Sequence, residues 1–190
     1  MTNSSLLLRD TPQSRLDEMY GPEDYYAYHA SPEFHQAFLK PIASWINQFG
    51  DPCLDVGCGR GWLGEHVTTP YCGVEGSVPA VDAARRLMPC KGFHCGRFED
   101  PAAWGLKAKF GTIVFGNIID YAVKPNARVL FIEMYVKLFE PKHLIVFELL
   151  RFDSRELERR FKLLKEFQAT ANVKGLQEIK KHRKVQVYEC

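Results

Sequence analysis

The sequence has 190 residues, enough for one globular domain with a sizeable core and too few for two ordinary domains. Hydrophobic residues make up 46% of the chain and charged residues 25%, which excludes a disordered or collagen-like protein. The formal net charge of only +2 excludes a polyanion-binding protein that is basic throughout, but it leaves a local basic patch open.

No apolar stretch reaches the roughly 20 residues that a membrane span needs, and the first residues lack the pattern of a signal peptide. The six cysteines form no CxxC pair and are too sparse for a disulfide framework. Cys90 and Cys95 are separated by four residues, but no cluster of Cys or His accompanies them, so we expect no metal site. We therefore expect a soluble, cytoplasmic protein with reduced thiols and no membrane partner.

The polar first 20 residues are predicted to be a frayed or loosely docked arm. Residues 24–49 are predicted to be helical in two pieces, the second beginning at Ser31 as N-cap with Pro32 in the first helical position. Apolar side chains then recur at a spacing of four, three and four, as Phe34, Phe38, Ile42 and Trp45. This spacing predicts one buried face.

From residue 51 onward, short apolar runs alternate with stretches that can form helices. The predicted strands are 53–56, 71–74, 92–95, 112–116, 144–150, 163–170 and 184–189. The predicted helices between them are 61–68, 78–87, 98–105, 126–139 and a last one from 153 to about 161. Near-continuous apolar strands separated by helices predict an α/β fold with a mostly parallel sheet covered by helices on both faces.

The most informative stretch is 54–62, LDVGCGRGW, where a buried strand meets a predicted helix. Glycines at such a turn let a ligand approach the main chain, and this end of a first strand is where open α/β sheets bind nucleotides. A dinucleotide site would need a glycine at position 62, where the chain has Trp62, and no phosphate-binding P-loop motif occurs. Glu75, at the tip of the second strand, is placed to accept hydrogen bonds from both ribose hydroxyls.

Three segments together resemble the first three motifs of class I S-adenosylmethionine-dependent methyltransferases: LDVGCGRG, GVEGS and HCGRFED. The resemblance extends over about residues 40–190 and implies a seven-stranded sheet whose last strand is antiparallel. It implies S-adenosyl-L-methionine as cofactor. The cofactor-binding residues that it implies are Asp55, Gly57, Cys58, Gly59, Gly61, Trp62, Glu75, Gly76, Phe98, Glu99 and Asn117. Arg97 stands where the family often has Asp, so Glu99 or Asp100 is expected to meet the adenine instead.

The acceptor is predicted less directly. Segment 116–121, GNIIDY, falls where the family faces its acceptor but lacks the Asn-Pro-Pro-Tyr type of tetrad, which makes planar amide acceptors less favoured. Where the acceptor must lose a proton, a base is needed, and the candidates are His29, His35, Asp120 and Tyr121. Each histidine can equally be an ordinary surface or hydrogen-bonded residue, and Asp120 can be a strand-end cap.

Tyrosines and acidic residues are dense before residue 40, which predicts either simple packing on the sheet or an aromatic lid over the acceptor. We interpret residues 1–40 as an N-terminal arm and helical lid, and residues 41–190 as the S-adenosylmethionine-binding domain. A small-molecule acceptor is the favoured substrate. The alternatives are an RNA methyltransferase that uses the basic run 180–184, otherwise a solvated loop, and a cofactor-binding protein that does not methylate.

Overall fold

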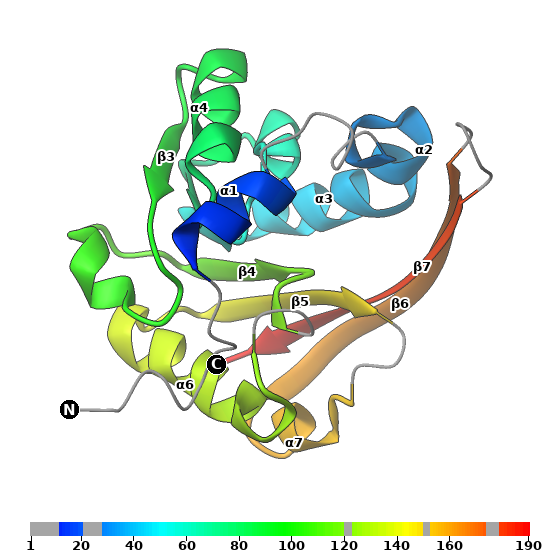
Figure 1. The fold of residues 1–190 in the computed structure, drawn as a ribbon. Helices are drawn as coiled ribbons and strands as arrows, with labels where there is room; N and C mark the ends of the chain where they lie inside the picture. The colour runs from blue at the N-terminus through cyan, green and yellow to red at the C-terminus, as the bar shows by residue number, and fades with distance from the viewer. Residues whose placement is uncertain (1–11, 21–27, 120–122, 150–152, 174–178) are drawn as a thin grey trace.

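A seven-stranded sheet runs through the centre of the molecule, in the order β3-β2-β1-β4-β5-β7-β6 (Figure 1). The computed structural model describes residues 12–20, 28–119, 123–149, 153–173 and 179–190. The strands are β1 (Cys53–Val56), β2 (Tyr71–Glu75), β3 (Gly92–Cys95), β4 (Thr112–Gly116), β5 (His143–Leu149), β6 (Lys162–Val173) and β7 (Ile179–Glu189). Strands β1 to β5 pair in parallel, while β7 runs antiparallel to both β5 and β6. The predicted mostly parallel sheet with an antiparallel last strand is confirmed.

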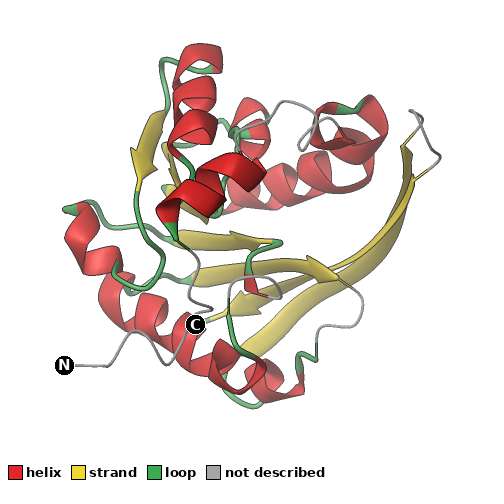
Figure 2. Cartoon of the chain, in the orientation of Figure 1, coloured by secondary structure: helices red, strands yellow, loops and turns green. Residues whose placement is uncertain are grey.

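Helices cover both faces of this sheet (Figure 2). The helical segments are α1 (Gln13–Tyr20), α2 (Pro32–Phe34), the π-helical turn η3 (His35–Leu39), α3 (Lys40–Phe49), η4 (Trp62–Glu65), α4 (Val78–Leu87), η5 (Pro101–Trp104), η6 (Pro125–Ala127), α6 (Arg128–Phe139) and α7 (Arg155–Glu158). Helices α3 and α4 contribute to the core on one face, and α6 and α7 contribute to the core on the other. Every residue of β1 and β2 is buried, as expected for parallel strands that are covered on both sides.

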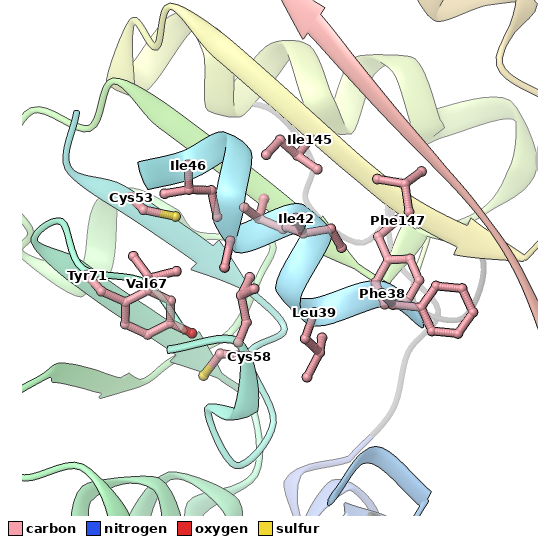
Figure 3. Packing of buried hydrophobic residues seen from close by; sticks show 14 of the residues in the cluster. Phe38, Leu39, Ile42, Ile46, Cys53, Cys58, Val67, Tyr71, Ile145 and Phe147 are labelled. Atoms are coloured by element: carbon pink, nitrogen blue, oxygen red, sulfur yellow. The ribbon is translucent and has the colours of Figure 1, made fainter. Parts of the chain in front are cut away.

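The predicted apolar stripe before residue 50 packs on the sheet. Ile42 and Ile46 of α3 face Cys53 of β1 and Ile145 of β5, and the ring of Phe38 packs tilted against that of Phe147 with centroids 5.3 Å apart (Figure 3). Burying each such side chain stabilises the fold by about 1.5–3 kcal/mol. The helix therefore forms part of the main core.

The helix predicted over residues 61–68 is wrong: the chain forms only the 3₁₀ turn η4 there. Gly61 has left-handed torsions at its start, and a second glycine, Gly64, lies within the turn. The β-branched pair Thr68–Thr69 and Pro70 follow, and these residues do not favour continuing a helix. The helix predicted over 98–105 likewise reduces to the short turn η5, which ends at the left-handed Gly105.

Two further predictions about the ends of the chain are corrected. Residues Gln13–Tyr20, predicted as a frayed or loosely docked arm, form helix α1, and the Asp17 carboxylate accepts a hydrogen bond from Val78 N at 2.9 Å, at the start of α4. The basic run 180–184 lies within β7 and is no solvated loop. β6 pairs with β7 along this whole run, and β5 joins from Arg183 onward, so the strand begins at Ile179. Among the described residues, none of the helices combines the length and apolar composition that crossing a bilayer requires.

Candidate cofactor and acceptor site

The strand order reverses direction at β1, which lies between β2 and β4. The chain proceeds from β1 outward to β2 and β3, then returns to β4 on the other side of β1. Ligands of open α/β sheets bind at such a switch point, outside the carboxyl ends of the strands. The loops after β1, β2 and β4 therefore define the candidate site.

Residues 57–61, which we call the β1 loop, connect β1 to η4. Its three glycines all have positive φ angles, 80° at Gly57, 54° at Gly59 and 81° at Gly61. At Gly61 any side chain would force its neighbours to shift, because a Cβ would lie 2.7 Å from the Met88 methyl carbon and 2.7 Å from a Phe93 ring carbon. The amides of Gly57 and Cys58 both donate to the Val74 carbonyl of β2, at 2.8 and 3.1 Å. The loop is therefore tied to the tip of β2.

Glu75, the last residue of β2, lies directly beside this loop. One carboxylate oxygen accepts from the Gly59 amide at 3.0 Å, and the other accepts from the Ser77 amide at 3.0 Å. Burial raises the pKa of Glu75, while these backbone amides act in the opposite direction. An ionised carboxylate has about four acceptor positions, so two amide bonds leave capacity for the hydroxyls of a diol.

Asp55, two residues before the β1 loop, is buried against a partner that the sequence did not suggest. The Tyr71 hydroxyl donates to the Asp55 carboxylate at 2.5 Å. Burial raises the pKa of Asp55 to about 7, the Tyr71 hydrogen bond lowers it, and the negative charge of Glu75 raises it further. The structure thus places two buried carboxylates at the carboxyl ends of neighbouring strands.

The segment after β3 is held by its own contacts. Arg97 forms an ion pair with Glu99 at 2.6 Å, and both side chains are partly buried. Trp104 Nε1 donates to the Arg97 carbonyl at 3.0 Å, and the Tyr135 hydroxyl donates to the Phe98 carbonyl at 2.8 Å. Phe98 packs partly buried against the core under α6. Of the two carboxylates expected to meet an adenine, Glu99 is thus already engaged by Arg97, and Asp100 accepts from the Ala103 amide at 3.3 Å.

Asn117 follows β4 and is the residue where the chain turns. Its φ of 56° is in the left-handed region, and its backbone amide donates to the Phe147 carbonyl of β5 at 2.7 Å. The next residue, Ile118, lies against the β1 loop, where a Cβ on Gly57 would be 3.1 Å from it. The loops after β1 and β4 are therefore in contact, as the switch point requires.

Three further predicted site residues have mainly structural surroundings. Trp62 begins η4 and is partly buried, with its ring centroid 6.0 Å from that of His35. Cys58 is buried, and burial raises the pKa of its thiol well above the ordinary value, so it is a poor nucleophile. Gly76 is buried after Glu75, and its carbonyl accepts a weak hydrogen bond from Cys95 at 3.8 Å.

The acceptor-side candidates are only partly described. Asp120 and Tyr121 lie outside the described residues. His29 is half-buried, with its ring centroid 3.9 Å from that of Tyr28 and 4.8 Å from that of Phe34. Phe34 in turn packs on Phe147 of β5, which brings His29 onto the sheet face that carries α3.

Several neighbours of the site were not predicted. Tyr71 and Phe93 were predicted only as strand residues, and no role was predicted for Met88. His35 was predicted as a possible base, but its partner His66 and the nearby Glu65 were not. His66 Nε2 lies 2.9 Å from His35 Nδ1. Contacts such as these join residues 16 or more positions apart, so no local sequence pattern predicts them.

The fold is similar to those of solved methyltransferases. The chain superposes on the N-methyltransferase NodS of Bradyrhizobium japonicum WM9, crystallised with S-adenosyl-L-homocysteine, with a TM-score of 0.69 and 12% identity over 95% of this chain and 98% of NodS. For the magnesium protoporphyrin IX methyltransferase ChlM of Synechocystis PCC 6803 with bound SAM, the TM-score is 0.67 at 12% identity, over 96% and 99% of the two chains.

A third similar structure is PH1948 of Pyrococcus horikoshii, described as a proposed RNA methyltransferase, with a TM-score of 0.62 and 11% identity over 93% of this chain and 94% of that one. No protein-family model matches the sequence, and none of the curated proteins matches it. The chain has the class I S-adenosylmethionine-dependent methyltransferase fold.

Proposed function

We propose that the protein binds S-adenosyl-L-methionine and transfers its methyl group to a small-molecule acceptor. The observation that carries this proposal is the pairing of the β1 loop with Glu75. Three left-handed glycines and a buried carboxylate meet at the carboxyl ends of β1 and β2. The cofactor supplies an activated sulfonium methyl group, so the protein mainly has to position the acceptor in line with it.

Glu75 fits the ribose of this cofactor. The hydrogen bonds from Gly59 and Ser77 orient its carboxylate, and its remaining acceptor positions suit two vicinal hydroxyls. The backbone of the β1 loop holds the methionine end, with Asp55 behind it. The Tyr71 hydroxyl donates to the Asp55 carboxylate and so fixes its orientation.

The adenine end is assigned to the segment after β3. Phe98 supplies an apolar surface, and Glu99, held by Arg97, orients that segment. Asn117 lines the crevice from the β4 side, because its neighbour Ile118 touches the β1 loop. The cofactor-binding residues in the proposal are Asp55, Gly57, Cys58, Gly59, Gly61, Trp62, Glu75, Gly76, Phe98, Glu99 and Asn117.

The acceptor is proposed to lie under the residues that precede α3. The proposed division takes residues 1–40 as the lid and residues 41–190 as the cofactor-binding domain. His29, Asp120 and Tyr121 are the candidates for a base, of which His29 packs against Tyr28 and Phe34. An aromatic, acidic lid suits an uncharged or cationic small molecule better than a phosphate backbone.

RNA is the second candidate acceptor, because residues 151–190 carry 11 basic against 6 acidic side chains. Within β7, however, Arg183 is buried and Lys184 Nζ donates to Ser154 Oγ at 3.0 Å. Cationic side chains that are buried or hydrogen-bonded in this way are less available to a phosphate backbone than the same side chains in a solvated loop would be. A cytoplasmic location stays a prediction from the sequence.

Calorimetry tests cofactor binding: we expect the protein to bind S-adenosylmethionine and S-adenosylhomocysteine and not NAD. Binding of NAD without binding of S-adenosylhomocysteine would overturn the proposal. Incubation of metabolite extracts and total RNA with isotope-labelled cofactor, followed by mass spectrometry, then identifies the acceptor. Formation of S-adenosylhomocysteine with acceptor present separates an enzyme from a protein that only binds the cofactor.

Two variants separate the acceptor classes. Deletion of residues 1–30 is expected to abolish turnover and to leave cofactor binding nearly intact, with Asp17→Ala as the control for the lost contact at α4. Turnover is expected to vary little with salt, whereas a single-stranded RNA acceptor would give a log–log slope of about −0.7 per phosphate contact. If Lys180→Ala with Lys181→Ala abolishes turnover and the deletion does not, RNA becomes the better answer.

A further inference from the structure

A cluster of metal-ligating side chains lies outside the cofactor site. His35, Glu65 and His66 each direct one donor atom into a common space, and the three atoms all lie within 4.8 Å of one another. His35 Nδ1 is 2.9 Å from His66 Nε2 and 4.0 Å from the nearer Glu65 carboxylate oxygen. The two imidazole rings are perpendicular, with centroids 4.9 Å apart.

The three residues come from two distant parts of the chain that the core holds together. His35 is the first residue of η3, between the buried Phe34 and the buried Phe38. Single turns of π-helix inside longer helices are rare and frequently mark functional sites. Here the π-helical turn separates α2 from α3 in an otherwise continuous helical stretch from Pro32 to Phe49.

Glu65 and His66 are held from the other side. The Asn47 side chain of α3 donates to the His66 carbonyl at 3.0 Å and accepts from the Thr68 amide at 2.7 Å. This pair of bonds fixes the backbone after η4 against α3. The cluster therefore does not depend on long flexible segments, and only side-chain torsions remain free to adjust.

The donor set matches one metal class. Two imidazole nitrogens and one carboxylate are a known ligand set for Zn²⁺, which leaves a fourth position for water or another ligand. In a tetrahedral site with Zn–N bonds of about 2.0–2.1 Å, two ligand atoms are about 3.3 Å apart. The histidine nitrogens need to separate by a few tenths of an ångström, and the carboxylate needs to approach by somewhat more. Glu65 has a side chain that is 36% exposed and can rotate to do so.

The surroundings of His66 favour a neutral ring with an available lone pair. Burial lowers the pKa of His66, the neighbouring His35 and Lys40 lower it further, and Glu65 acts in the opposite direction. The ring of Trp62 also faces His35, at a centroid distance of 6.0 Å. His35 Nε2 is buried and has no hydrogen-bond partner among the described residues, so the contact of Nδ1 with His66 is what orients the ring.

We propose that His35, Glu65 and His66 bind one divalent transition-metal ion of the Zn²⁺ class, which joins the N-terminal helical segment to the turn that follows the β1 loop. Hard cations such as Mg²⁺ prefer oxygen ligands and do not suit this site. The ion links η3 to the end of η4, two parts that already meet through the His35–His66 contact. Its binding is independent of the proposed methyltransferase activity. The sequence alone predicted no metal site, because the three ligands are neither adjacent as a motif nor spaced as in known zinc signatures.

The test is metal binding by the full chain without any cofactor. Calorimetry with Zn²⁺ is expected to give one site per chain, and Co²⁺ is expected to give the visible absorption of a low-coordinate site with nitrogen ligands. Mg²⁺ is expected to give neither signal. Binding is also expected to raise the unfolding temperature, because an ion that binds only the folded state stabilises it.

Three variants identify the ligands. Glu65→Gln removes an exposed carboxylate, which leaves the fold intact, whereas His35→Asn and His66→Asn remove one ring each. Each change is expected to weaken Zn²⁺ binding by at least about 100-fold, since partners that merely orient a ligand already cost about 10–100-fold. The matched control is His94→Asn on β3, which is expected to bind Zn²⁺ as the natural chain does.

Adventitious binding by thiols needs a separate control, because Cys90, Cys95 and Cys190 are exposed. The triple variant with serine at these positions is expected to retain the Zn²⁺ site. The proposal is overturned if the natural chain binds Zn²⁺ no more tightly than the Glu65→Gln variant, which would make His35 and His66 a simple hydrogen-bonded pair. It is equally overturned if the thiol variant loses the binding and the histidine variants keep it.

Discussion

The β1 loop with Glu75 and the N-terminal segment 28–39 lie on the same half of the molecule but are built by different means. The β1 loop is defined by backbone: three glycines with positive φ and four amides that donate to Val74 and Glu75 or within the loop. The N-terminal segment is defined by side chains, with Phe34 and Phe38 fully buried and the rings of Tyr28 and His29 packed edge-on against Phe34.

This difference explains why the β1 loop suggests a widely used cofactor, whereas the N-terminal segment suggests a specific acceptor. A glycine-rich loop binds a cofactor through backbone groups, so the same loop suits every protein that uses this cofactor. Only a few residue types can adopt its torsions. Aromatic and imidazole side chains can be exchanged while the fold persists, so they are free to specify an acceptor. We therefore expect substitutions in the β1 loop to affect both fold and cofactor binding, and substitutions in the N-terminal segment to affect them separately.

The largest effect is expected for Gly61→Ala. The new Cβ would lie 2.7 Å from Met88 and Phe93, and φ at this position is 81°. Overpacking costs about 1–3 kcal/mol and the left-handed torsion about 1 kcal/mol more, so urea unfolding should show a loss of about 2–4 kcal/mol.

Gly105→Ala is the matched control, since φ is 66° there and a Cβ would meet nothing within 4 Å. It should show only the cost of the torsion, about 1 kcal/mol. Equal losses in the two variants would contradict the argument from close packing at Gly61.

The next effect concerns binding. Glu75→Ala should weaken S-adenosylhomocysteine binding by about 1.5–3 kcal/mol, the usual contribution of hydrogen bonds to a charged group. Calorimetry on folded protein measures it, and Glu99→Gln is the comparison, because Glu99 is paired with Arg97 and should matter less. A Glu75 variant that binds as the natural chain does would remove the main support for the proposed cofactor site.

Asp55→Asn should change how stability depends on pH. In the folded chain the pKa of Asp55 is raised to about 7 from its usual 3.8, mainly by burial, so the folded state keeps a proton that the unfolded state loses. Raising the pH from about 4 to 7 therefore destabilises the natural chain at this position, by at most about 1.4 kcal/mol per pH unit.

The asparagine variant cannot titrate, and its amide oxygen can still accept from Tyr71. Between pH 5 and 6.5 the natural chain should lose about 2 kcal/mol relative to the variant, as measured by urea unfolding at each pH. Parallel pH profiles for the two proteins would show that the Asp55 pKa is not raised.

Much of the fold could be predicted because its signals are local. The strands β1, β3 and β4 were predicted with their observed ends, since each is a short apolar run bounded by polar residues, Gly or Pro. The β1 loop was predicted because its glycines are needed for torsions and for close packing at Gly61.

What failed depends on contacts between distant residues. β7 extends back to Ile179 because β6 pairs with it over its whole length, and this pairing overrides the polar character of the run 180–184. The Tyr71–Asp55 hydrogen bond joins neighbouring strands, and the His35–His66 contact joins a helix to a turn 31 positions later. Periodicity and motif spacing carry no information about such pairs.

The smallest expected effect lies at the start of the N-terminal segment. Ser31 has extended torsions, with ψ of 141°, and its hydroxyl accepts from the Phe34 amide at 3.2 Å, which makes it the N-cap of α2. Ser31→Ala should lower the free energy of unfolding by about 1 kcal/mol, and Ser31→Asp, which retains an acceptor, should restore it. Because this cap supports side-chain packing and touches none of the amides around Glu75, S-adenosylhomocysteine affinity should stay unchanged in both variants. A parallel loss of stability and affinity would mean instead that the N-terminal segment also shapes the β1 loop, and the two regions would have to be treated as one site.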